Sequence, residues 1–564
     1  MKTLFKGGNV VNVFSGKTER RDVLVEGEYI VGVGEYSETY ADTVVDVSGK
    51  YLSPGFIDGH IHIESTMLCP AEFARVVCPR GTTSVIADPH EIANVAGVSG
   101  IRYMIEASRG LPISVYIALP SCVPATPNCE AGAILEAEDL EPLYAEDSVV
   151  ALGEVMNYFG VIAEDEKIIR KIERAKANGR VINGHAPLLS GNNLSLYVSK
   201  GITDDHECSS FQEAIERISL GQRIMIRQGT AAKNLEAMLS LFDSDAKYRC
   251  MLVSDDKHPA DLLSVGHIDD IIRCAVSAGK NPVDAIRMAS ICAAEHFGLK
   301  KLGAIAPGFI ADIAVLEDLE KVEVAAVYKK GVLAAKGGEA VEFEIPSVDV
   351  ALEGAVRSSF NFQKVTEKSF KIEENRVRNC RVISVIKGEL ITEEKIEEVD
   401  FSRNNGIDTE RDILKVAVIE RHKNTGHIGL GFIHGIGLKC GAIASSVSHD
   451  AHNLIVMGAS EGDMALAAEC VRNMGGGLAV IKDGRIIAKM PLPIGGLMTD
   501  VSCAEAARQN EEVRAAVHAL GVPADIEPFM TTAFVSLPVI PHLKMTTYGL
   551  IDVNSQKLLP LFAD

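Results

Sequence analysis

The central half of the chain, from about residue 51 to 298, alternates short apolar runs with longer amphipathic stretches. Helical periodicity separates most of the apolar runs, for example over 164–178 and 210–220. Eight strand–helix units in about 250 residues are typical of a (β/α)₈ barrel, so we expect an α/β TIM barrel over 51–299. A doubly wound open sheet is the alternative, and it is less favoured because no Gly-x-Gly-x-x-Gly turn follows a strand. The predicted strands are 53–57, 82–88, 113–119, 149–153, 180–184, 201–204, 223–227 and 250–254.

Two flanking regions show other patterns. Residues 1–50 and 300–340 contain β-branched runs broken by glycine, and we pair them into one composite small β-domain. Residues 345–564 predict a C-terminal α+β domain that is distinct from the barrel and unsuited to burying the helices of the barrel. Its expected strands are 377–386, 413–421, 442–447 and a hairpin over 478–488, and its expected helices are 461–474 and 502–520.

Composition restricts the class of protein. A chain of 564 residues is too long for one core, so two to four domains are expected. The net charge of -21 disfavours nucleic acid as a partner, because phosphate binding needs a basic face. No apolar run reaches the ~18 residues needed to cross a membrane, and the start of the chain has no secretory signal. The 12 cysteines form no Cys-x-x-Cys pair, which indicates reduced thiols and a cytoplasmic location.

Histidines and carboxylates follow five of the predicted barrel strands, at the carboxyl end of each strand. His60 and His62 come first, and because alternate residues of a strand point the same way, the two imidazoles project together. In a barrel these carboxyl ends of the strands meet on one rim. Each residue alone is compatible with a hydrogen-bonded loop start, but together they predict a metal site. The full set is His60, His62, Glu154, His185, His206 and Asp255, with Asp256 next.

The number of these side chains indicates the number of ions. One catalytic Zn²⁺ takes three protein ligands, so six candidates suit two ions per subunit, with Glu154 bridging them. Imidazole and carboxylate ligands without thiolate are compatible with Mn²⁺, Fe²⁺ or Zn²⁺, and the residues leave that choice open. We take Mn²⁺ as the working expectation.

The order His-x-His, carboxylate, His, His, Asp on strands 1, 4, 5, 6 and 8 resembles the amidohydrolase superfamily, and Pro307–Ile313 looks like that superfamily's return into its β-domain. Many members carry a carboxylated lysine at the end of strand 4, where this chain has Glu154. Within the superfamily, several stretches are similar to the microbial adenine deaminase family, and the likeness runs the whole length. These stretches are GHIHIESTM (59–67), GTTSVIADPHEIANV (81–95), GHAP (184–187), SDDKHP (254–259) and SHDAHN (448–453).

The resemblance implies hydrolysis of the 6-amino group of adenine to give hypoxanthine and ammonia, as in purine salvage, by a hydroxide that bridges two metals. Asp255 is then the candidate for moving the proton toward the leaving amine. His90 and Glu91 are candidates for protonating the ring nitrogen or binding the substrate, although a capped turn around Pro89 explains them equally well. Arg227 or Gln228 is expected to contact the purine edge or to form a loop ion pair.

The segment Ser448–Asn453 is a cluster of polar residues in the otherwise apolar strands of the C-terminal domain. A further metal site is one interpretation, and a hydrogen-bonded turn is the favoured one. We expect this turn to reach over the barrel mouth and close the adenine pocket, with His449 and His452 contacting substrate. The remaining alternatives are another amidohydrolase reaction on a cyclic amide or a different amino-heterocycle, a scaffold without activity, and an acidic binding module. Adenine is the expected partner, together with self-association into a homo-oligomer.

Overall fold

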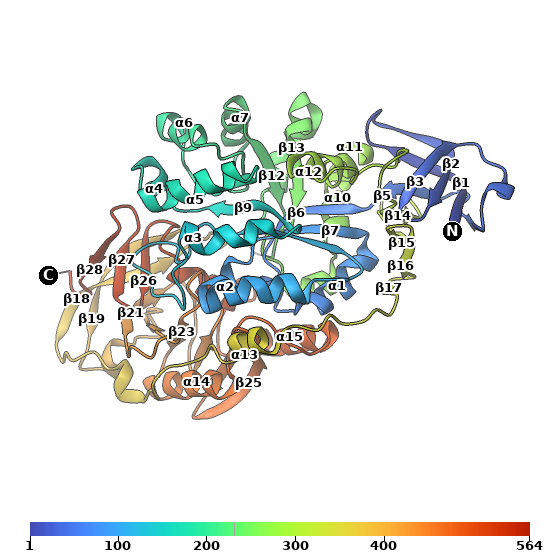
Figure 1. The fold of residues 1–564 in the computed structure, drawn as a ribbon. Helices are drawn as coiled ribbons and strands as arrows, with labels where there is room; N and C mark the ends of the chain where they lie inside the picture. Colours follow the sequence, from blue (N-terminus) through green and yellow to red (C-terminus); the bar gives the residue numbers. More distant parts are fainter. Residues whose placement is uncertain (231, 564) are drawn as a thin grey trace.

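A barrel of eight parallel strands forms the centre of the molecule in the computed structural model, which describes residues 1–230 and 232–563 (Figure 1). The strands form a five-stranded sheet, β6 to β10, and a three-stranded sheet, β11 to β13. The backbone N–H of Asp255 donates to His60 O at 3.0 Å, and that of Thr203 donates to Ile182 O at 2.9 Å, so the two sheets meet at both seams. The strands are β6 (Phe56–Ile61), β7 (Thr82–Ala87), β8 (Ser114–Leu119), β9 (Val149–Val155), β10 (Val181–Gly184), β11 (Asp204–Asp205), β12 (Arg223–Arg227) and β13 (Cys250–Val253).

The barrel elements form for the reasons that their sequences indicate. Strands β6, β7 and β9 are buried at every residue, as expected of parallel strands covered on both faces. Helix α5 buries Ile168, Ile172 and Ala175 on one face. The surrounding helices are α1 (Pro70–Val77), α2 (His90–Ala107), α3 (Ala137–Leu140), α4 (Tyr158–Ile162), α5 (Glu166–Ala177), α6 (Gly191–Ser199), α7 (Phe211–Ser219), α8 (Leu235–Met238), α9 (Pro259–Ser264), α10 (Ile268–Ser277), α11 (Pro282–Met288) and α12 (Ile291–His296).

A nine-stranded sheet lies at the end of the molecule that carries the N-terminus (Figure 1). Strand β14 pairs antiparallel with β5, and this pairing joins the strands that follow the barrel to those that precede it. The order is β17-β16-β15-β14-β5-β1-β2-β3, with β4 on β1. The strands are β1 (Lys2–Asn12), β2 (Lys17–Glu26), β3 (Tyr29–Gly34), β4 (Thr43–Asp46), β5 (Tyr51–Pro54), β14 (Ile313–Leu316), β15 (Val324–Lys329), β16 (Val332–Lys336) and β17 (Glu339–Ala340).

The C-terminal part of the chain builds an eight-stranded sheet in the order β19-β18-β21-β20-β23-β22-β24-β25 and a small sheet of β26 to β28. Its strands are β18 (Val377–Val385), β19 (Thr392–Asp400), β20 (Leu414–Ile419), β21 (Ile428–His434), β22 (Ala442–Ser445), β23 (Leu454–Gly458), β24 (Gly477–Lys482), β25 (Arg485–Pro491), β26 (Leu543–Thr546), β27 (Gly549–Asp552) and β28 (Lys557–Leu559). Its helices are α13 (Val350–Arg357), α14 (Glu461–Met474), α15 (Cys503–Ala519) and α16 (Pro528–Ala533).

The C-terminal part covers helices of the barrel, contrary to expectation. Helix α15 packs on α9, and α13 packs on α2. Val513 and Val517 of α15 share one hydrophobic cluster with Leu262 of α9. The expectation was wrong because a periodic apolar face shows that a helix is covered, but not by which distant segment.

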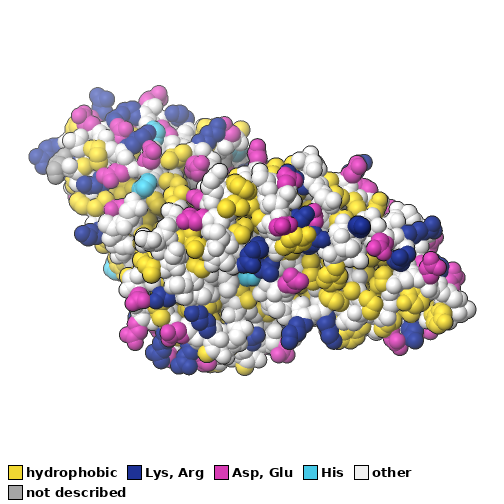
Figure 2. All heavy atoms as spheres, turned by 90° about the horizontal axis from the view of Figure 1, so that it is seen from above, with side chains coloured by type: hydrophobic (Ala, Val, Ile, Leu, Met, Phe, Trp, Pro, Cys, Tyr) yellow, Lys and Arg dark blue, Asp and Glu magenta, His cyan; other side chains and the backbone are white. Residues whose placement is uncertain are grey.

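The α/β fold class, with a TIM barrel, a flanking β-domain and an additional α+β domain, is confirmed. Within the described residues, no helix is both long and apolar enough to span a bilayer. On the face seen in Figure 2, acidic and basic side chains are interspersed.

Candidate active site

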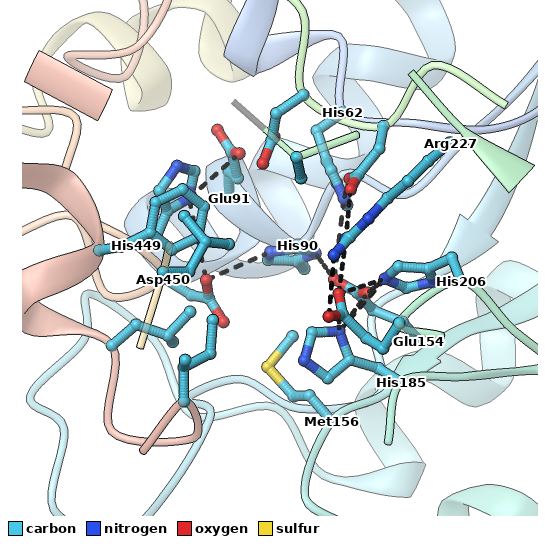
Figure 3. Close-up of a pocket in the computed structure, with 18 residues that line it drawn as sticks. His62, His90, Glu91, Glu154, Met156, His185, His206, Arg227, His449 and Asp450 are labelled. Atoms are coloured by element: carbon cyan, nitrogen blue, oxygen red, sulfur yellow. Dashed lines mark hydrogen bonds and ion pairs between the residues drawn. The ribbon is translucent and has the colours of Figure 1, made fainter. Parts of the chain in front are cut away.

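The four histidines expected at the strand ends surround Glu154, which lies in β9, and Figure 3 shows His62, His185 and His206 beside it. Glu154 Oε2 is 2.9 Å from His206 Nε2 and 3.0 Å from His185 Nδ1. The same oxygen is 3.8 Å from His60 Nε2, and Oε1 is 3.7 Å from His62 Nε2. The structure therefore places imidazoles from β6 and from the ends of β10 and β11 around one buried carboxylate.

Asp255 completes this group from the end of β13. Its Oδ1 atom is 3.4 Å from His62 Nε2 and 3.7 Å from His60 Nε2. His62 Nδ1 lies 3.0 Å from the carbonyl oxygen of Asp88, which can only accept, so Nδ1 carries the proton. The lone pair of Nε2 therefore faces the two carboxylates, which is the orientation that a metal ligand needs.

The donor set fits divalent cations. His185 Nδ1 and His206 Nε2 are only 3.2 Å apart, with Glu154 beside both. Within the described residues, the buried Nε2 atom of His60 has no hydrogen-bond partner. Burial opposes ionisation, but the neighbouring histidines hold the pKa of Glu154 well below its usual range. The groups His60–Glu154–His206 and His60–His62–Asp255 are each compact and buried enough to hold an ion.

Arg227 forms the ion pair that was one of its two expected roles. Its Nη1 atom donates to Glu207 Oε1 at 2.6 Å and to Asp255 Oδ2 at 2.7 Å. Arg227 also lines the cavity beside the cluster. Gln228 is not among the described residues that line this cavity. Glu207 was missed from the sequence, although its position directly after His206 could have drawn attention to it.

His90 and Glu91 begin helix α2 and face the cavity, so they are more than a turn around Pro89. His90 Nδ1 is 3.5 Å from Glu154 Oε1 and 3.5 Å from Asp88 Oδ1. Burial alone would lower the pKa of His90, but Asp450 and Asp88 raise it well above its usual value. These neighbouring carboxylates therefore favour the protonated form of His90.

Glu91 shares a hydroxyl with a second carboxylate. Ser65 Oγ lies 2.6 Å from Glu91 Oε1 and 2.5 Å from Asp256 Oδ1. One hydroxyl has a single proton and cannot donate to both acids, so one of them must hold a proton of its own. Burial, Asp256 and Glu64 raise the pKa of Glu91 to about 8. Glu91 is therefore a neutral carboxylic acid at pH 7, and Ser65, which the sequence analysis missed, connects it to Asp256.

The turn Ser448–Asn453 reaches the barrel mouth. His449 and Asp450 line the cavity, and His449 Nδ1 is 3.5 Å from Glu91 Oε1. His452 lies behind the lining, with Nε2 at 3.8 Å from Glu91 Oε2. The N–H of Ser448 donates to His452 Nδ1 at 3.2 Å, so the proton of the neutral ring sits on Nε2. The turn is therefore hydrogen-bonded as expected, and Glu91, His449 and His452 also form a compact buried group that could hold a metal ion.

The cavity has two unlike sides, and its empty space of about 410 Å³ includes solvent at its mouth. Its floor is the cluster around Glu154, and its roof comes from the C-terminal part of the chain. The ring of His449 stacks on Phe534 with centroids 4.4 Å apart. An apolar roof over a polar floor suits a flat heteroaromatic ring with a polar edge. The roof residues are Leu390, His449, Asp450, Phe534, Leu537 and Ile540.

Comparison with known proteins decides the family. Residues 51–334 match the amidohydrolase family, and residues 389–557 match the adenine deaminase C-terminal domain. The chain is 45% identical to "Adenine deaminase 2" of Carboxydothermus hydrogenoformans, over 99% of this chain and 96% of the relative. It is 43% identical to "Adenine deaminase" of Clostridium acetobutylicum, over 99% of this chain and 97% of the relative. The chain belongs to the adenine deaminase family.

The family expectation from the sequence is thereby confirmed, and the chain is an enzyme of the amidohydrolase class. Among solved structures, it is similar to a β-aspartyl dipeptidase from Fervidobacterium islandicum. The TM-score is 0.48 at 19% identity, over 61% of this chain and 100% of that one. Family membership and the clustered imidazoles and carboxylates together support a divalent metal ion.

Proposed function

We propose that this member of the adenine deaminase family hydrolyses adenine to hypoxanthine and ammonia. The observation that carries the proposal is the cavity itself. A buried cluster of histidines and carboxylates at the ends of barrel strands forms its floor, and the domain characteristic of the family forms its roof. Adenine presents a flat ring and a polar edge, which match these two sides.

The strand-end cluster would hold two divalent cations, with Mn²⁺ the first choice over Fe²⁺ and Zn²⁺. When bound, such a pair lowers the pKa of water and so supplies hydroxide at neutral pH. The residues proposed to hold it are His60, His62, Glu154, His185, His206 and Asp255.

The other side chains have roles in proton transfer and binding. Glu91, neutral at pH 7, would donate its proton to the ring nitrogen next to C6 when hydroxide attacks C6. Asp255 takes the proton of the added hydroxyl and delivers it to the leaving amine, while Arg227 holds the other oxygen of Asp255 in place. His90 and His449 contact the substrate between floor and roof. His452 supports Glu91 from behind.

The test is an ammonia-release assay on protein loaded with Mn²⁺, using adenine, adenosine, guanine and a hydantoin, with hypoxanthine identified by chromatography. Ammonia and hypoxanthine from adenine in equal amounts are expected. Activity on the hydantoin and none on adenine would instead assign the protein to another amidohydrolase reaction.

Finer features belong to the same proposal. We propose a cytoplasmic homo-oligomer with domains at 1–50 plus 300–340, 51–299 and 345–564. Elemental analysis of the purified protein would identify the metal, and sedimentation would give the number of subunits.

A further inference from the structure

Asp450 is a buried carboxylate that the C-terminal part of the chain brings to the cavity. Its side chain is 4% exposed, and Oδ1 lies 3.7 Å from His90 Nε2. Within residues 1–230 and 232–563, its Oδ2 atom is buried without a hydrogen-bond partner. A buried carboxylate oxygen with no donor is costly, because it has lost its hydration and gained nothing in exchange. A donor from the substrate would remove that cost.

The position of Asp450 relative to the floor indicates which group of the substrate donates a hydrogen bond to it. The imidazole of His90 lies between two carboxylates, with Glu154 at 3.5 Å and Asp450 at 3.7 Å (Figure 3). Each of the two acids contacts one nitrogen of the His90 ring, so the width of that ring and the two contact distances set the distance between Glu154 and Asp450. A purine is a fused bicycle, so its six-membered ring can meet the Glu154 cluster while its imidazole ring reaches Asp450.

We propose that Asp450 accepts the imidazole N–H of the purine and thereby selects the free base against 9-substituted purines. This inference rests on the proposed function and adds a specificity-determining residue to it. A free base always carries one imidazole N–H, which in a closed cavity needs an acceptor. A 9-substituted purine has no such N–H, leaves Oδ2 of Asp450 unpaired, and directs its substituent at Asp450 and the apolar roof.

The test compares adenine with 9-methyladenine on the Mn²⁺-loaded wild type, Asp450→Asn and Asp450→Ala. A second readout, independent of turnover, is calorimetric binding of hypoxanthine and 9-methylhypoxanthine. Asp525→Asn, an exposed carboxylate of the same domain, is the matched control. Metal content and melting temperature are measured for every variant.

With Asp450→Asn, kcat/KM for adenine and affinity for hypoxanthine are expected to fall about 10- to 100-fold, the loss typical of a hydrogen bond to a charged group. The 9-methyl compounds should change less than about threefold, so that the preference for the free base collapses. Asp525→Asn should behave as wild type.

An equal loss for both members of each pair would overturn the proposal and assign Asp450 to positioning His90. An unchanged preference in both variants would overturn it as well. If the wild type releases no ammonia from adenine but prefers hypoxanthine in an Asp450-dependent way, the proposed reaction fails and the recognition by Asp450 stands.

Discussion

The floor and the roof of the cavity are built on opposite principles. The floor, on the barrel, concentrates ionisable groups around Glu154, each within 4 Å of others. The roof, on the C-terminal part, is apolar except for His449 and Asp450. Strand backbones position the floor, and a turn positions the roof. Reactivity and recognition therefore come from separate parts of the chain, so they should respond to mutation separately.

The roof turn has a support of its own in Arg421. This arginine is fully buried, with Nε donating to His452 O at 2.5 Å and Nη2 donating to Gly495 O at 2.9 Å. Burial lowers the pKa of Arg421 to about 9. Among the described residues no carboxylate forms an ion pair with Arg421, so burying its charge costs free energy. The hydrogen bonds of Arg421 to the backbone therefore hold the turn that carries His449 and Asp450 in place.

The largest effect is expected from breaking the floor. Glu154→Gln removes the anion that His60, His185 and His206 share, so turnover should fall by at least about 10³-fold, and metal content should drop in elemental analysis. Glu138→Gln, on an exposed carboxylate of the same barrel, is the control. Full activity with two bound ions would contradict the assignment of Glu154.

The next effect tests the proton donor between floor and roof. Glu91→Gln keeps the shape but removes the acidic proton, and kcat should fall about 10²- to 10³-fold. A carboxyl with pKa about 8 is protonated below that pH, so wild-type kcat/KM should decline as pH rises through 8. That basic limb should be absent from the pH profile of Glu91→Gln. A limb of unchanged position in the variant would assign it to another group.

A smaller effect is expected from the apolar roof. Phe534→Ala removes the ring that stacks on His449, and KM for adenine should rise roughly tenfold while kcat changes less than about threefold. Phe534→Leu should restore most of the affinity because it keeps the apolar surface. Phe14→Ala, at an exposed phenylalanine far along the chain, is the control. Loss of kcat at constant KM would place Phe534 in the chemistry.

Alanine variants of His449 and His452 test whether the turn of the roof contributes to substrate binding. Alanine at His449, which lines the cavity, should raise KM severalfold, and alanine at His452 should act more weakly, through Glu91. Unchanged turnover and KM in both variants would show that the turn does not close the pocket.

The smallest effect on activity is expected at Lys544, which is fully buried behind the roof and donates to Leu390 O at 2.9 Å. Burial lowers its pKa to about 7, whereas the unfolded chain keeps a lysine near the usual 10.4. Between these values the unfolded state binds more protons, so stability rises with pH, and the cost of the buried charge is complete only below pH 7.

Lys544→Met should therefore unfold at higher temperature than wild type at pH 6, by an amount equivalent to roughly 3–5 kcal/mol less the lost hydrogen bond. The advantage should shrink as pH rises from 7 to 10. Thermal melts at five pH values measure it, and a constant difference would contradict the buried charge.

The barrel and its rim of histidines and carboxylates could be predicted from the sequence alone. Periodicity identifies which residues face a core, and the strand ends share one rim in every such barrel. For this reason β12 and α14 lie at the predicted 223–227 and 461–474, and the six strand-end residues meet as expected. Strand β11 is shorter than 201–204 predicted, because only Asp204 and Asp205 pair with β12.

The sequence also predicted that Ser448–Asn453 reaches over that rim, but the contacts between the two sides of the cavity came from the three-dimensional packing. The Ser65 hydroxyl between Glu91 and Asp256 and the contact of Asp450 with His90 each join segments far apart in the chain. A local pattern of apolar and polar residues carries no information on which distant surfaces meet. That information resides in the packing of α13 and α15 on the barrel, which brings the roof over the floor.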